Sequence, residues 1–89
     1  MADLKFNNVE VLLIDPDHGY RQTMFSMMHN VGIRNIKQGA TMAEIRRAFT
    51  ASEPDLLISE TNLPDGDFCS FVYGLRHHSV GNNPFLPIL

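Results

Sequence analysis

Three acidic side chains carry the chemistry that this sequence suggests. Asp15 and Asp17 follow the apolar run at residues 9–14, and Glu60 follows the run at residues 56–59. Short, β-branched apolar runs are typical of parallel strands that are buried on both faces. Since the carboxyl ends of such strands open into one crevice, where ligands collect, we expect the three carboxylates to converge in an acidic pocket.

The same three carboxylates would destabilise the fold if nothing neutralised them. Asp15, Asp17 and Glu60, gathered without a cation, repel one another. Replacing Asp15 with Asn is then expected to stabilise the protein. The alternative is that Asp15 and Asp17 only shape the turn and cap the helix that follows.

The elements that must position these acids alternate between strands and helices. Strands are predicted at residues 9–14, 34–38 and 55–59, and residues 84–89 have the pattern of the start of a fourth. This alternation predicts an α/β fold with right-handed crossovers, a parallel sheet in the order 2-1-3-4 and helices on both faces. The second run contains few apolar residues, so we expect it at the edge of the sheet.

Three amphipathic helices are expected between and after these strands. Thr41 and Glu44 fit a capping box at the start of the second helix, and Gly32 is expected to end the first. Asp65 or Asp67 is expected to cap the third. Residues 78–83 are expected to form a loop. The apolar positions at helical spacing are Tyr20, Met24, Met27, Met28 and Val31, then Met42, Ile45 and Phe49, then Phe68, Phe71, Val72 and Leu75.

The composition fits one small domain spanning residues 1–89. Hydrophobic residues make up 44% of the chain and charged residues 19%, a balance typical of a globular domain. No apolar run approaches the roughly 18 residues of a membrane helix. The amino-terminal residues lack the layout of a secretory signal, so we expect a cytoplasmic protein that does not bind membranes.

A net charge of -3 and scattered Lys and Arg residues argue against nucleic-acid binding. The single cysteine, Cys69, is expected to be a buried apolar residue.

Two segments together resemble the receiver domain of two-component response regulators. They are LLIDPD at residues 12–17 and LLISETNLPDG at residues 56–66. The resemblance implies a flavodoxin-like, CheY-like parallel sheet. It covers nearly the whole chain as far as the fourth strand. We therefore expect an incomplete domain, truncated in or near that strand, either in the natural protein or as a fragment of a longer receiver.

The resemblance also implies roles for the acidic residues. In that family, acids after the first strand and an Asp after the third bind Mg²⁺, and that Asp takes a phosphoryl group from a histidine kinase. The match places Asp15 at the first acid, Pro16 at the second and Glu60 at the phosphoacceptor. It places Asn62 at the residue whose main-chain carbonyl completes the metal site.

Three departures from the family pattern argue against phosphorylation. Pro16 offers no side-chain oxygen to an ion that demands octahedral oxygen ligands. The extra methylene of Glu60 moves its carboxylate by about 1 to 1.5 Å, which is enough to disturb an in-line transfer. The Thr or Ser and the Lys that sense or neutralise the phosphate in the family would lie beyond Leu89.

The sequence therefore predicts a degenerate signalling module rather than an enzyme. We expect no catalytic residue and no cofactor, and protein partners such as a histidine kinase that bind the helical faces. The alternative is a working phosphoacceptor with a weak Mg²⁺ site at Asp15, Asp17, Glu60 and Asn62. Mimicry of a phosphorylated Asp by Glu60, and a purely structural role, also stay open. A sheet that stops in its fourth strand exposes an edge, so we expect a homodimer formed through residues 84–89 or a helical face.

Overall fold

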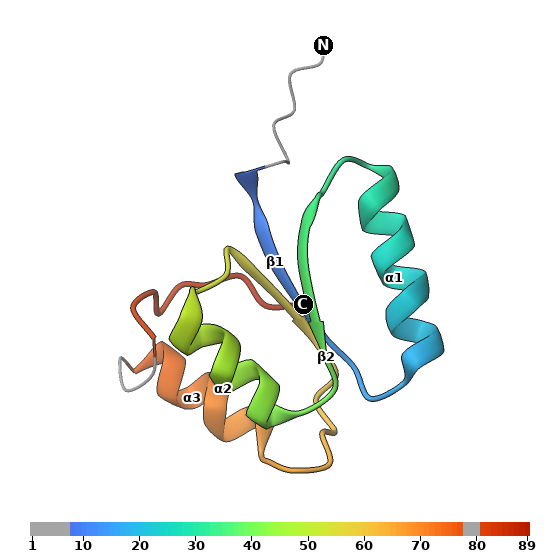
Figure 1. The fold of residues 1–89 in the computed structure, drawn as a ribbon. Coiled ribbons are helices and arrows are strands. Elements are labelled where there is room, and N and C mark those ends of the chain that lie inside the picture. Colours follow the sequence, from blue (N-terminus) through green and yellow to red (C-terminus); the bar gives the residue numbers. More distant parts are fainter. Residues whose placement is uncertain (1–7, 78–80) are drawn as a thin grey trace.

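Strands and helices alternate along the chain, as the sequence predicts. A computed structural model describes residues 8–77 and 81–89 (Figure 1). Of the predicted loop at residues 78–83, residues 78–80 lie outside this part. The elements are β1 (Glu10–Ile14), α1 (His18–Asn30), β2 (Asn35–Gly39), α2 (Met42–Ala51), β3 (Leu56–Ser59) and α3 (Phe68–Arg76). In the described ranges, none of these helices has both the length and the apolar character needed to cross a membrane.

The three strands form a parallel sheet in the order β2-β1-β3. The central strand β1 is almost completely buried, since Val11 through Ile14 are each at most 3% exposed. Its last residue, Ile14, is paired in register with Gly39 of β2 and with Ser59 of β3. The predicted edge position of the second strand is confirmed, and β2 is the least apolar of the three strands.

A short segment lies beside β3 where a fourth strand is expected. Leu57 forms an isolated parallel bridge with Ile88. The N–H of Leu57 donates to the carbonyl of Pro87 at 3.0 Å, and the N–H of Leu89 donates to the carbonyl of Leu57 at 2.9 Å. The pairing is too short to count as a strand, so the sheet of the described residues has three strands with a bridged segment, residues 87–89, along β3.

Two charged side chains, one on α3 and one just after α2, hold the residues that lead into this segment. Arg76 donates through Nη1 to the carbonyls of Pro84 and Leu86, at 2.7 and 2.8 Å. Glu53 accepts the N–H groups of Asn82 and Asn83. Leu86 itself is fully buried, which adds an apolar contact to these polar ones. Neither charged residue was expected to have this role.

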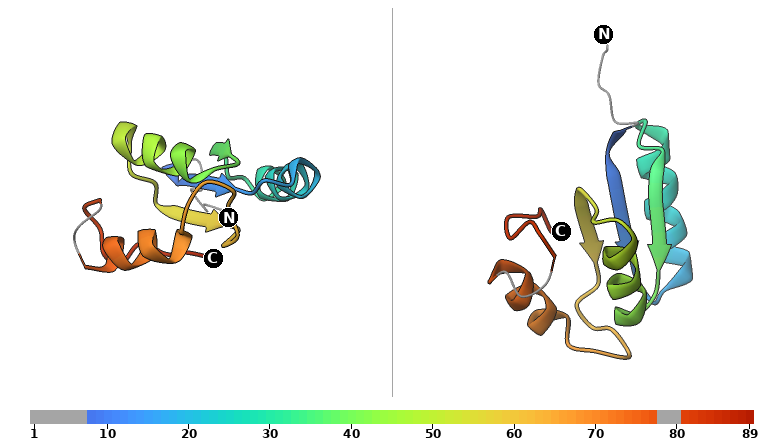
Figure 2. Two further views of the ribbon diagram at one scale, coloured as in Figure 1. Left: turned by 90° about the horizontal axis from the view of Figure 1, so that it is seen from below. Right: turned by 60° about the vertical axis from the view of Figure 1, so that its left-hand side comes forward.

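Helices cover both faces of the sheet, as expected, but unequally (Figure 2). Helix α1 packs on one face, where the buried residues are Val11, Leu13 and Met28. Helices α2 and α3 pack together on the other face. The buried residues there are Leu12, Ile14, Met42, Ile45, Leu57, Leu63, Phe68, Phe71, Leu75 and Leu86. One helix therefore covers one face and two helices cover the other.

Two burial expectations are wrong. Of the five apolar residues predicted on the inner face of α1, three are largely exposed: Tyr20 by 54%, Met27 by 59% and Val31 by 62%. Met28 is buried and Met24 is partly buried, as predicted, and Phe25, which was not predicted, also packs partly against the sheet. Cys69 is also exposed rather than buried, because it lies in the first turn of α3 on the side away from the sheet.

The predicted helix ends are largely confirmed. Thr41 caps α2 by accepting the N–H of Glu44 at 3.2 Å, and Glu44 reaches back to accept the N–H of Ala40 at 2.7 Å. Gly32 follows the last turn of α1 with a φ of 104°, which suits a residue without a Cβ. Of the two candidates for the cap of α3, Asp67 is the one used.

Candidate functional site

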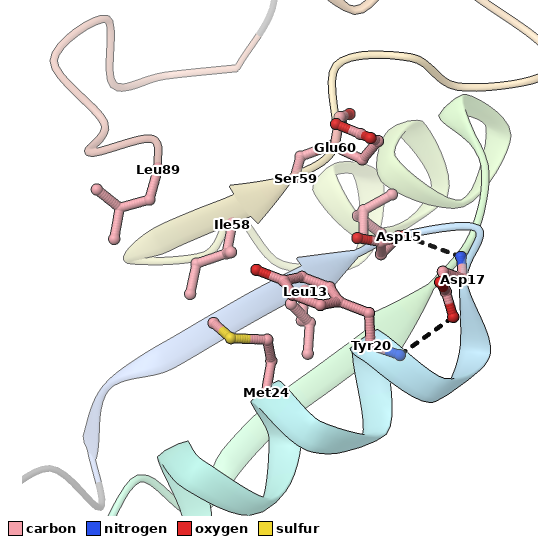
Figure 3. A pocket seen from close by; sticks show the side chains of 10 residues that line it. Leu13, Asp15, Asp17, Tyr20, Met24, Ile58, Ser59, Glu60 and Leu89 are labelled. Atoms are coloured by element: carbon pink, nitrogen blue, oxygen red, sulfur yellow. Dashed lines mark hydrogen bonds between the residues drawn. The ribbon is translucent and has the colours of Figure 1, made fainter.

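A hollow of about 510 Å³ opens beside the carboxyl ends of β1 and β3 (Figure 3). It lies on the α1 face of the sheet, between α1 and the segment at residues 87–89. Its walls combine carboxylates at the strand ends with apolar side chains along the strands. The lining residues are Leu13, Ile14, Asp15, Asp17, Tyr20, Met24, Ile58, Ser59, Glu60 and Leu89.

Main-chain pairing brings Asp15 and Glu60 together at one end of this hollow. Ile14 and Ser59 are paired in register, so the next residue of each chain segment leaves the sheet at the same edge. The N–H of Glu60 donates to the carbonyl of Ile14 at 3.0 Å, and the N–H of Asp15 donates to the carbonyl of Gly39 at 3.0 Å. The expectation that the ends of the first and third strands lie side by side is thus confirmed.

Each of the three carboxylates accepts a main-chain N–H group. Asp15 accepts from Asp17 at 2.8 Å, and Asp17 caps α1 by accepting from Tyr20 at 3.1 Å. Glu60 accepts from its neighbour Thr61 at 2.9 Å. Asp15 and Asp17 therefore shape the turn and cap α1, and they also line the hollow (Figure 3).

Side chains offer few ligands for an octahedral Mg²⁺ ion at this end of the hollow. Among residues 8–77 and 81–89, no three His, Cys, Asp or Glu side chains lie in an arrangement that could hold a metal ion. Asn62 is exposed and does not line the hollow. Pro16, which follows Asp15, supplies no side-chain oxygen. An ion that needs about six oxygens in near-ideal geometry would thus find few here.

Arg21 is a residue of this region that the sequence did not single out. Its Nη1 donates to the main-chain carbonyl of Asp15 at 2.6 Å, and its Nε donates to the side chain of Gln38 at 3.3 Å. The guanidinium thereby joins the end of β1 to β2 and brings a positive charge close to the acids. In the sequence, only its place about one turn into the helix that follows Asp15 indicates that Arg21 lies near the end of β1.

The apolar part of the hollow follows the strands away from the acids. Leu13 and Ile58 come from neighbouring strands, and Met24 faces them from α1 (Figure 3). On the far side Leu89 is 75% exposed. The hollow is therefore apolar along the strands and is lined by Asp15, Asp17 and Glu60 at the strand ends.

The loop after Glu60 is fixed to the start of α2. Asp65 accepts the N–H groups of Met42 at 2.7 Å and of Ala43 at 3.1 Å. The hydrogen bond from Met42, with the one from Ala43, lowers the pKa of Asp65 below its usual value. The pKa of Asp67 is lowered as well, chiefly by the hydroxyl of Ser70, which donates to it at 2.8 Å.

Close packing fixes the same loop at Gly66. A Cβ at this position would lie 2.5 Å from Cγ of Met42. The loop and the helix therefore approach each other at a point where only glycine fits. This contact was not expected from the sequence.

No protein-family model matches this chain, and a search of curated proteins finds no match. The function must therefore be argued from the hollow and its residues.

Proposed function

We propose that this chain is a degenerate receiver-like signalling module of a two-component phosphorelay system. It acts in the cytoplasm by binding other proteins and takes no phosphoryl group on Glu60. Its fold in this proposal is flavodoxin-like with strand order 2-1-3-4, in which residues 87–89 stand at the position of the fourth strand.

The observation that carries the proposal is the placement of Asp15 and Glu60. They directly follow Ile14 and Ser59, which are paired across two parallel strands. Acidic residues at the carboxyl ends of neighbouring parallel strands, with β1 in the centre, are what the resemblance to receivers implies. The parallel order β2-β1-β3 agrees with the same fold.

The argument against phosphorylation comes from the same residues. Pro16 takes the place of a metal-binding acid, and Glu60 is longer than the Asp that the chemistry uses. The Glu60 carboxylate accepts the N–H of Thr61 at 2.9 Å, so one oxygen already has a partner. Phosphoryl transfer depends on positioning and on neutralisation of charge by a metal, and both are weakened here.

The test is a measurement of intact mass. The full chain is incubated with a small acyl phosphate and Mg²⁺, and its mass is compared with that of the untreated protein. We expect no phosphate adduct. A stoichiometric adduct that disappears in Glu60→Gln would overturn the proposal and favour the working phosphoacceptor instead.

A further inference from the structure

We propose that the hollow beside β3 is a docking groove for an amphipathic helix of a partner protein, one whose apolar face ends in Lys or Arg. This inference rests on the proposed function, because it gives the chemistry of the partner for a module that works by binding proteins. It concerns the α1 face of the sheet.

The two faces of the sheet are covered unequally. Parallel sheets are normally covered by helices on both faces. Here α2 and α3 share one face, whereas α1 alone lies on the other, over β1 and β2 (Figure 2). On that face Leu56 and Ile58 of β3 stay only partly buried. The uncovered strip lies beside an existing helix, and a second helix could pack there in the same way.

The groove is lined by apolar side chains on three sides. Leu13 and Ile58 come from the sheet, with Tyr20 and Met24 on the α1 side and Leu89 on the other side (Figure 3). Tyr20 is 54% exposed and Leu89 is 75% exposed, so these apolar surfaces are free to bind. A groove lined in this way suits the apolar face of a helix, a recurring mode of peptide recognition.

The acidic side chains at one end of the groove determine which charge a docked helix must carry at that end. Asp15, Asp17 and Glu60 all line the strand-end side of the groove. The positive charge of Arg21 lies near these acids, but its guanidinium binds the main-chain carbonyl of Asp15 and the side chains of Gln38 and His18. One nearby cation does not balance three carboxylates. A cationic side chain at the end of the docked helix would therefore complement the acids, whereas an acidic end would be repelled.

The same charges argue against a second copy of this chain as the occupant. A symmetric contact places the same patch on both sides of the interface. Two grooves facing each other would bring two sets of Asp15, Asp17 and Glu60 together. In addition, the best-buried apolar faces of α2 and α3 already pack on their own sheet.

The test uses fluorescence anisotropy with the full chain and three labelled helical peptides. The peptides have about 18 residues, long enough to be helical, and share one apolar face. They differ in ending with Lys and Arg, with neutral residues, or with Glu. We expect the basic peptide to bind about tenfold or more tightly than the acidic one, with a difference that shrinks as salt is added.

Variants locate the binding. Ile58→Ser and Leu89→Ser are expected to weaken all peptides, and Leu89 is exposed enough for its variant to stay folded. Glu60→Gln is expected to weaken the basic peptide several-fold and to leave the neutral one unchanged. The control Ala51→Lys changes the net charge by the same amount from α2, and Tyr73→Ser removes an exposed apolar side chain from α3. Both should bind as the original chain does.

Several outcomes would overturn the inference. They are no binding of any peptide, equal binding of all three, or binding that ignores the Leu89 and Glu60 variants. A self-association that Leu89→Ser and Glu60→Gln both abolish would also overturn it, because a second copy would then occupy the groove. These results are independent of the phosphate adduct, so failure of the groove and failure of the proposed function can be told apart.

Discussion

The main-chain N–H of Glu60 donates to the carbonyl oxygen of Ile14 at 3.0 Å. This bond joins the first residue after β3 to the last residue of β1. It keeps the Glu60 backbone beside that of Asp15, whatever the two side chains do. The acidic end of the hollow is therefore a property of the sheet and not of a loose loop.

A carboxylate at position 16 should strengthen Mg²⁺ binding. We expect the double variant Pro16→Asp, Glu60→Asp to bind Mg²⁺ about tenfold or more tightly than the original chain, since one added carboxylate near a divalent ion contributes a favourable Coulomb energy. Isothermal titration calorimetry measures the difference. The matched control is Pro16→Ala, Glu60→Asp, which removes the ring and adds no carboxylate. Equal affinity of the two double variants would contradict the role given to Pro16.

The contact between Gly66 and Met42 predicts a loss of stability in Gly66→Ala. A Cβ at 2.5 Å from Cγ of Met42 must displace that side chain from the core, so the free energy of unfolding should fall by about 1 to 3 kcal/mol. Urea denaturation measures it. Gly19→Ala is the control, because its Cβ would meet only Asp17, at 3.5 Å, near the start of α1. There Ala should be neutral or should stabilise by up to about 1 kcal/mol.

Acid should weaken the fold through Asp65 and Asp67. Both have a pKa below the usual 3.8 in the folded protein, because main-chain and hydroxyl groups donate to the charged form. The stabilisation that these two carboxylates provide is fully present at pH values above their pKa in the unfolded chain. It is lost as the pH falls through their lower pKa in the folded protein. Denaturation from neutral pH to below 3.8 should therefore show falling stability.

The matched variant is Asp65→Asn, Asp67→Asn. Asn still accepts hydrogen bonds as a cap but carries no charge to titrate. The double variant should lose less stability than the original chain over the same acid range. A pH dependence identical to that of the original chain would show that these two carboxylates do not contribute.

The outer edge of the segment at residues 87–89 predicts self-association. Phe85 next to this edge is 86% exposed, and unpaired edges bind further chains. Sedimentation at micromolar concentration should detect a dimer, and Phe85→Ser should shift it toward monomer. Tyr73→Ser, which removes another exposed aromatic residue, should leave it unchanged. A monomer throughout the concentration range would refute the expected homodimer.

The strands could be predicted because their information is local. Val11 to Ile14 form a short apolar run bounded by turn residues, which favours a strand buried on both faces. Because parallel strands end at the same edge of the sheet, the acids that follow two such strands are expected at that edge. The capping box at Thr41 and Glu44 is equally local. Its side chains satisfy main-chain groups within four residues.

The helix orientation and the long-range contacts could not be predicted. Apolar residues surround much of α1, and only packing against the sheet selects Met28 for burial over Met27 and Val31. By its spacing Asp65 could cap α3. Instead it accepts the N–H of Met42 at the start of α2, and these two residues are 23 positions apart in the sequence. No pattern along the chain encodes such a choice, because it depends on how the elements meet in space.

Cross-linking measures directly whether Asp15 and Glu60 lie side by side. Cysteines are introduced at both positions in a Cys69→Ser chain and treated with a short bis-maleimide reagent. Neighbouring strands lie only about 4.8 Å apart, so we predict an intramolecular cross-link in most of the protein, read by intact mass and peptide mapping. The control pair, Asp15→Cys with Asp55→Cys, joins opposite ends of the sheet and should not cross-link. Efficient cross-linking of the control, or none between positions 15 and 60, would contradict the account.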